Sequence, residues 1–156
     1  MKNKLQRLVA HLTTAQYQGR LLAKPGEFDA WIEGGEIEPS SKKINGNGII
    51  AARINYSGVI SINPCAAPAE LIATYVSFWL QENGEKHESD TVEFSVDKLD
   101  DNSVELELTI ENISEEIQLI ESSTGPFVLN DKKYDFGESS LWIAETFTLT
   151  GEIDND

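Results

Sequence analysis

Several residue types are scarce in this sequence, and each shortage excludes a class of protein. Cys65 is the single cysteine among 156 residues, so an internal disulfide is excluded, which agrees with a reducing compartment. No apolar run approaches the roughly 20 residues of a membrane span, and no N-terminal run suits a signal peptide. We therefore expect a soluble chain that is made in the cytoplasm and has no membrane partner.

Basic residues are also scarce: 12 Lys and Arg stand against 27 Asp and Glu, for a net charge of −15. The imbalance is concentrated in residues 85–156, which carry 20 acidic and four basic side chains. Without a basic track the chain would repel nucleic-acid phosphates, so direct nucleic-acid binding is not expected. The acidity fits solubility alone, an acidic face presented to a basic partner, or an acidic face that DNA can slide past without sticking.

The residues that usually carry catalysis are missing from the required patterns. His11 and His87 are the only histidines, with no cysteine or carboxylate at ligand spacing, so zinc and iron sites are not expected. The acids of residues 97–102 lack the spacing of a calcium loop and fit a hairpin turn better. No Gly-x-Ser-x-Gly or P-loop motif is present, and Cys65 is interpreted as a small buried residue. These observations predict no enzyme, no cofactor and no metal.

Helical periodicity dominates the first half of the chain. Residues 68–83 carry a wide apolar stripe at helical spacing, with Pro68 suited to a first turn and Gly84 suited to a helix end. We expect the main core helix there. A shorter amphipathic helix is predicted over residues 2–16, and a third helical segment over residues 28–33, where the aromatic side chains have helical spacing.

Beyond Gly84 the apolar period changes to two, which is typical of strands. Residues 92–97 and 104–110 alternate apolar and acidic side chains around a turn, predicting an antiparallel pair with one apolar and one acidic face. Glu105, Glu107 and Glu111 should then point to solvent. Residues 49–62 form another predicted strand, with a bulge or turn at its glycine. The order of elements predicts an α+β fold: a single domain over residues 1–156, with a mostly antiparallel sheet packed against two or three helices.

Three residues, Lys42, Lys43 and Trp142, are candidates for contacts with a partner. Residues 39–48 are polar and rich in chain-breaking residues, which predicts an exposed mobile loop. Lys42 and Lys43 lie in it and could contact an acidic neighbour. Trp142 stands out of phase with the apolar pattern around it, so it could serve an interface. Residues 151–156 read as a frayed acidic tail.

Two stretches together resemble the tail completion protein R (GpR) family of contractile-tailed bacteriophages and their prophages. The first runs from Lys-Pro-Gly-Glu-Phe at residues 24–28 to Trp-Ile-Glu-Gly-Gly-Glu-Ile at residues 31–37. The second runs from Arg-Ile-Asn-Tyr-Ser-Gly at residues 53–58 through Leu-Ile to Trp-Leu-Gln-Glu-Asn at residues 79–83. The resemblance spans most of residues 5–113 and rests on the order and spacing of packing motifs.

This resemblance implies a structural role in virion assembly, with the protein located in the virion tail. Such proteins act at the head-proximal end of the tail tube, stop its growth and prepare the tail for head joining. The implied partners are tail-tube and head–tail joining proteins, together with further copies of the chain, for which a ring is the expected assembly. The alternative is a monomeric acidic module that imitates DNA and inhibits a basic partner. Self-association would favour the first interpretation, and a persistent monomer with salt-sensitive binding would favour the second.

Overall fold

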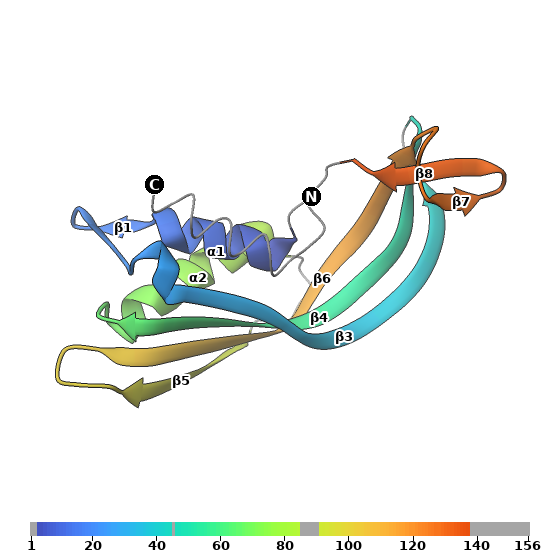
Figure 1. Cartoon of the computed structure of the whole chain (residues 1–156). Coiled ribbons are helices and arrows are strands. Elements are labelled where there is room, and N and C mark those ends of the chain that lie inside the picture. The colour runs from blue at the N-terminus through green and yellow to red at the C-terminus, as the bar shows by residue number, and fades with distance from the viewer. Residues whose placement is uncertain (1–2, 45, 85–90, 138–156) are drawn as a thin grey trace.

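Two helices lie on one face of a mostly antiparallel sheet, which confirms the predicted α+β fold (Figure 1). The computed structural model describes residues 3–44, 46–84 and 91–137. The elements in chain order are α1 (Lys4–Thr14), β1 (Gln16–Tyr17), β2 (Arg20–Leu21), the 3₁₀ turn η1 (Pro25–Glu27), β3 (Phe28–Lys43), β4 (Gly48–Cys65), α2 (Ala69–Asn83), β5 (Val92–Lys98), β6 (Val104–Glu121), β7 (Phe127–Leu129) and β8 (Lys132–Phe136).

The sheet is built around the three long strands β3, β4 and β6. The main strand order is β3-β4-β6-β8-β7, and β5 also pairs with β6; every pairing is antiparallel. Since β4 occupies one edge of β6, β5 and β8 share the opposite edge, with β5 beside residues 104–110 and β8 beside residues 119–121. The two ends of β6 therefore belong to two different parts of the sheet.

All three long strands are irregular at the same level, and the sheet bends there. Register shifts occur between Ile32 and Gly34 in β3 and between Tyr56 and Gly58 in β4. Asn112 in β6 has a φ of 57°, in the left-handed region. Bulges bend strands and increase their twist, so aligned bulges turn the whole sheet. Beyond the bend, residues 34–57 and 113–137 form a curved arm that leads away from the helices (Figure 1).

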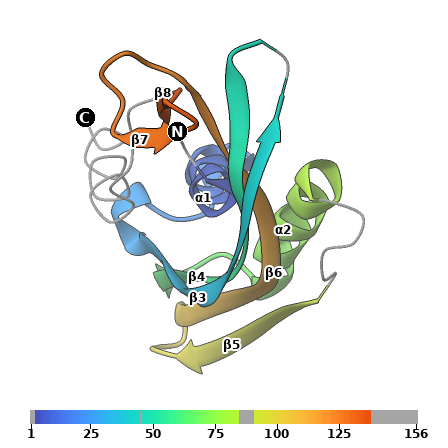
Figure 2. The same cartoon turned by 90° about the vertical axis from the view of Figure 1, so that its right-hand side faces the viewer.

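The main core lies between the two helices and the sheet before the bend (Figure 2). The shorter helix, α1, contributes most to it: Leu5, Leu8 and Leu12 are each no more than 1% exposed. The longer α2 has the predicted position, but only Ile72 and Val76 are fully buried in it. We conclude that α2 covers the margin of the core, whereas α1 fills its centre.

A second, smaller cluster stabilises the arm. Ile49, Leu119 and Tyr134 are about 5% exposed and come from β4, β6 and β8. Phe127 and Phe136 meet edge to face at 5.6 Å between ring centroids, a favourable geometry for aromatic pairs. The arm therefore has an apolar cluster of its own, separate from the one beneath the helices.

The helix predicted over residues 28–33 is wrong, because these residues begin β3. Phe28, Ala30 and Ile32 alternate toward the helices while their neighbours are exposed, which is the period of a strand. In so short a segment, helical and strand spacing share several positions, so pairing with β4 decides the structure. Gly34 follows the register shift in β3 and Gly35 pairs with Tyr56, so these glycines continue the strand and do not end a helix.

The predicted loop over residues 39–48 is also shorter in the structure. Residues 39–43 continue β3, and the connection to β4 spans residues 44–47. Pro39 is tolerated because β3 is an outer strand of the sheet, where a missing N–H need not break a ladder. Residue 45 lies outside the described residues.

The remaining strand predictions are confirmed where the structure describes the chain. β5 and β6 form the predicted antiparallel pair, and the irregularity at Gly58 is a bulge. Free Cys65 is buried. The acidic tail over residues 151–156 lies outside the described residues, as do His87 and Trp142. Within residues 3–44, 46–84 and 91–137, no helix is long and apolar enough to cross a membrane.

Candidate assembly surfaces

One carboxylate, that of Glu115 in β6, anchors the N-terminus of α1 to the arm. Its Oε1 accepts a hydrogen bond from the backbone N–H of Lys4 at 2.8 Å, and its Oε2 accepts one from Tyr56 Oη. A helix start has unpaired N–H groups and a positive dipole end, so a carboxylate is favourable there. Asn3 and Gln6 form a capping box at the same end. A backbone N–H of α1 and side chains of β4 and β6 therefore hold the arm and α1 together at the bend.

Tyr56 is the buried member of this anchor, with an exposed fraction of 4%. Burial, followed by the negative charge of Glu115, raises the pKa of Tyr56 far above its ordinary value. The phenol therefore remains protonated and keeps donating to Glu115. Nearby, an added Cβ on Gly58 would lie 2.9 Å from Leu5, so the helix sits directly on the bulge.

Replacing Glu115 with alanine is expected to lower the free energy of unfolding by about 2 kcal/mol. The change leaves Tyr56 Oη and the Lys4 N–H without their acceptor in a part-buried position, and an unsatisfied donor costs about 1–3 kcal/mol. Urea denaturation followed by circular dichroism measures the difference. The matched control is Glu111→Ala, an exposed acid on the same strand, for which about 0.5 kcal/mol or less is expected. Equal effects of the two variants would contradict the anchor.

The face of the sheet opposite the helices is acidic. Asp29 lies opposite Ser61, Ser61 opposite Glu107, and Glu107 opposite Ser95. Residues opposite each other in a ladder share a face, and the alternate residues of β6 are buried against the helices. The predicted separation of apolar and acidic faces is thus confirmed on this strand pair. We call this surface the acidic outer face; it comprises Asp29, Glu93, Asp97, Glu105 and Glu107 with Ser61, Ser95 and Thr109.

An aromatic side chain adjoins the acids on the same face. Trp31 in β3 is opposite Val59, and Val59 is opposite Thr109. Trp31 is 39% exposed while Val59 is fully buried. No Lys or Arg occupies these described outer-face positions of β3, β4, β5 and β6. The surface therefore combines acidic groups with one partly exposed tryptophan.

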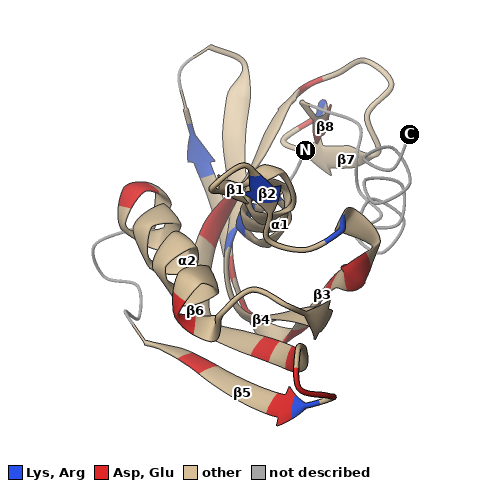
Figure 3. Ribbon diagram, turned by 90° about the vertical axis from the view of Figure 1, so that its left-hand side faces the viewer, with Lys and Arg blue, Asp and Glu red and all other residues tan. Residues whose placement is uncertain are grey.

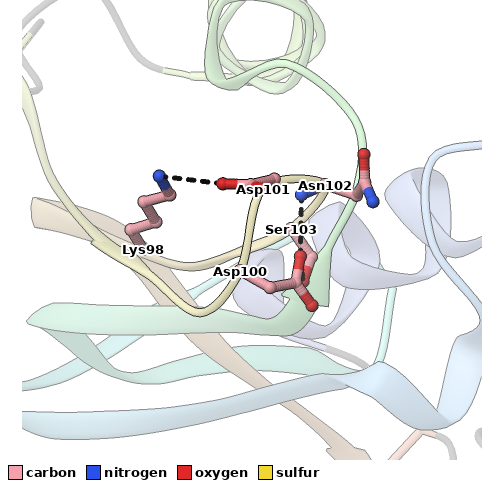
Figure 4. A network of polar contacts seen from close by, with 5 residues as sticks. All are labelled: Lys98, Asp100, Asp101, Asn102 and Ser103. Atoms are coloured by element: carbon pink, nitrogen blue, oxygen red, sulfur yellow. Dashed lines mark hydrogen bonds and ion pairs between the residues drawn. The ribbon is translucent and has the colours of Figure 1, made fainter.

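The turn between β5 and β6 is closed by its own side chains (Figure 4). Asp100 Oδ1 accepts hydrogen bonds from the Asn102 N–H at 2.7 Å and from Ser103 Oγ at 3.1 Å, and Lys98 pairs with Asp101 at 3.2 Å. The bond from the Asn102 N–H is the main cause that lowers the pKa of Asp100. These acids form the hairpin turn that the sequence predicted. In the part of the chain that the structure describes, no group of three or more His, Cys, Asp or Glu could hold a metal ion.

Lys42 and Lys43, the predicted contact residues, are exposed at the end of β3, far along the arm. The structure brings two further lysines, Lys132 and Lys133 of β8, to the same end of the sheet (Figure 3). Lys132 pairs with Glu121 at 3.0 Å, and hydrogen bonding to Glu121 raises the pKa of Lys132. Four of the ten basic residues in the described part of the chain therefore lie at the end of the arm.

The end of the arm also exposes apolar side chains on its outer face. Val128 is 65% exposed and lies opposite Lys133; Ile120 is 42% exposed and lies opposite Asp135. Alternate residues of a strand share a face, so Ile120 and Gln118 lie on the same face of β6. Gln118 is opposite Ile50 of β4, and Ile50 is opposite Lys42 of β3, so Lys42 lies on this face as well. We call this surface the arm-end patch; it comprises Lys42, Ile120, Val128, Lys133 and Asp135. The sequence did not single out its apolar members, because each is ordinary for a strand.

A hollow lies between the β1–β2 hairpin and the start of α2. Its volume is about 390 Å³, and its lining includes Tyr17, Arg20, Leu21, Lys24 and Leu71. Cys65 lies outside this lining, and burial raises the pKa of its thiol. The lining of the hollow combines apolar side chains with two cations, Arg20 and Lys24, and one acid, Glu27, and it includes no residue of the acidic outer face or of the arm-end patch.

Comparisons with known proteins give one finding. The family model described as P2 phage tail completion protein R (GpR) matches residues 2–138 of the 156-residue chain. Neither the curated proteins nor the solved structures yield a match. The matched range includes both helices and every described strand, so the family covers the anchor, the acidic outer face and the arm.

Proposed function

The chain belongs to the P2 phage tail completion protein R (GpR) family, and from that membership we propose that it completes the head-proximal end of a phage tail tube and prepares it for head joining. The observation that carries this proposal is the match over residues 2–138, which spans almost all of the described structure. On this proposal the protein resides in the virion tail and acts by binding, without catalysis.

The shape of the subunit supports such a role. A terminating subunit needs a rigid body, held here by the core beneath α1 and α2, and surfaces that neighbouring proteins can contact. The arm and the acidic outer face provide two chemically distinct surfaces on opposite parts of the sheet. We infer that the partners are tail-tube proteins, head–tail joining proteins and further copies of this chain, arranged as a ring.

Electron microscopy of tail tubes mixed with gold-labelled protein tests the proposal. We expect the label at one end of each tube, and we expect a lysate that lacks the protein to contain separate heads and tails. Adding the purified protein should then restore infectious particles. Label along the whole tube, or particles that assemble equally without the protein, would overturn the proposal. Salt-sensitive binding of a stable monomer to a basic protein unrelated to tails would instead favour the DNA-mimic alternative.

A further inference from the structure

The outer edge of β3 is poorly suited to pairing with another strand. β3 ends the strand order, and among the described strands it pairs with β4. Pro39 lies within it, and its register shifts twice, between Ile32 and Gly34 and between Pro39 and Lys42. Proline, bulges and charged residues are features that protect sheet edges from strand addition. A neighbour is therefore expected to contact the arm through side chains on a face, and not by extending the sheet along β3.

The arm-end patch has the composition of such a contact. Val128 and Ile120 offer exposed aliphatic surface, and Lys42 and Lys133 add positive charge beside it. Asp135 is the acid within the patch, and its Oδ1 accepts a hydrogen bond from the Phe136 N–H at 2.8 Å. The cluster of Ile49, Leu119 and Tyr134 beneath the patch fixes the backbone that presents it. An occupant should therefore be acidic and also offer some apolar surface.

We propose that the arm-end patch of one copy of the chain docks on the acidic outer face of a second copy. This inference rests on the proposed function, in which several copies assemble at one tail end. Charge complementarity selects the occupant: the acidic outer face carries five carboxylates with no Lys or Arg among its described positions, and Trp31 adjoins it. Lysines meet carboxylates, and the aliphatic side chains meet the tryptophan, which is a residue enriched at interfaces.

The contact joins two different surfaces, so it is heterologous. The first copy then still has a free acidic outer face, and the second copy still has a free arm-end patch, for further neighbours. Heterologous contacts form rings where the rotation between copies closes, and open filaments where it does not. The contact proposed here thus supplies the kind of interface that a ring requires.

Charge reversal tests the contact in the full-length protein. The variant Lys42→Glu/Lys133→Glu should weaken self-association by roughly tenfold or more, measured by sedimentation velocity at micromolar concentration. The variant Glu105→Lys/Glu107→Lys should weaken it similarly. An equimolar mixture of the two variants should restore association, because the two proteins can alternate so that each changed patch meets a changed face and each unchanged patch meets an unchanged face. Combining all four changes in one chain should also restore association. The control is Lys24→Glu/Glu70→Lys, which changes charges away from both surfaces and should leave association unchanged.

Cross-linking gives a second measurement that does not depend on affinity. Because Cys65 is buried, single cysteines placed at Val128 and at Ser95 can be labelled selectively. A mixture of Val128→Cys and Ser95→Cys proteins should give cross-linked dimers with a short bis-maleimide. The control mixture of Val128→Cys with Ala73→Cys should not, since Ala73 is an exposed position on α2 outside the proposed contact.

The outcomes separate the contact from the proposed function. A wild-type chain that stays monomeric, association that ignores the charge reversals, or cross-links with Ala73→Cys as readily as with Ser95→Cys would overturn the contact. If the contact fails in one of these ways and the protein still labels one tube end and restores infectious particles, the proposed function stands and only the contact fails. Association that follows the charge reversals, without any binding to tail tubes, would support the contact and overturn the function.

Discussion

Replacing Leu8 with alanine is expected to lower the free energy of unfolding by about 3 kcal/mol, enough to remove much of the stability of a small domain. Leu8 is 1% exposed and lies at the centre of α1, between Leu5 and Leu12 and against the buried residues of the sheet. Truncation loses the transfer free energy of the side chain and leaves a cavity, because close-packed neighbours relax only in part. Urea or thermal denaturation measures the effect.

The control for Leu8 is Phe78→Ala on α2. Phe78 is larger than Leu8, but it is 66% exposed, so its truncation is expected to change stability by about 0.5 kcal/mol or less. The comparison tests whether burial, and not side-chain size, sets the loss of stability. If Phe78→Ala were as damaging as Leu8→Ala, the depth of Leu8 in the core would not explain its effect.

The hydrophobic pattern of the sequence was sufficient to predict the type of those elements that are long enough to show several repeats of a helical or strand period. The helix at 69–83 and the β5–β6 pair extend over several repeats, so a single interpretation fits them. The segment at 28–33 is too short for that, and its pairing with β4 overrides the helical spacing of its aromatic residues. The sequence pattern also could not predict how deeply each helix is buried. α1 and α2 are both amphipathic, and only the tertiary arrangement places α1 at the centre of the core.

The candidate surfaces show a similar division. Alternation was enough to place Glu105 and Glu107 on the outer face, and composition identified Lys42 and Lys43 as candidates. One signal for the anchor was present: Glu115 occupies an inward phase between Ile113 and Ile117, where an acid needs a partner. The partner of Glu115 at the start of α1 lies 111 residues earlier in the chain. Lys42 precedes the Val128 that it joins in the arm-end patch by 86 residues. Only the strand order brings such distant residues together.

Replacing Gly35 with alanine is also expected to lower the free energy of unfolding by about 3 kcal/mol. An added Cβ at Gly35 would lie 2.0 Å from the backbone oxygen of Asn55 and 2.7 Å from Tyr56 Cα. Both obstacles belong to β4, so no side-chain rotation can relieve the clash and the strands must separate at the bend. Overpacking typically costs about 1–3 kcal/mol, and a backbone obstacle places this change at the upper end.

Gly137→Ala is the matched control, because among the described residues no atom other than those of its chain neighbours lies within 4 Å of its added Cβ, and its φ is outside the left-handed region. We expect its unfolding midpoint to stay close to wild type. The position of Gly35 also links stability to assembly, since Tyr56 joins the bend to Glu115 and the start of α1. A Gly35→Ala protein that remains folded should therefore present its arm at a changed angle and self-associate less than wild type. Unchanged stability together with unchanged association would show that β3 and β4 need not approach this closely, and the bend would lose its role in positioning the arm.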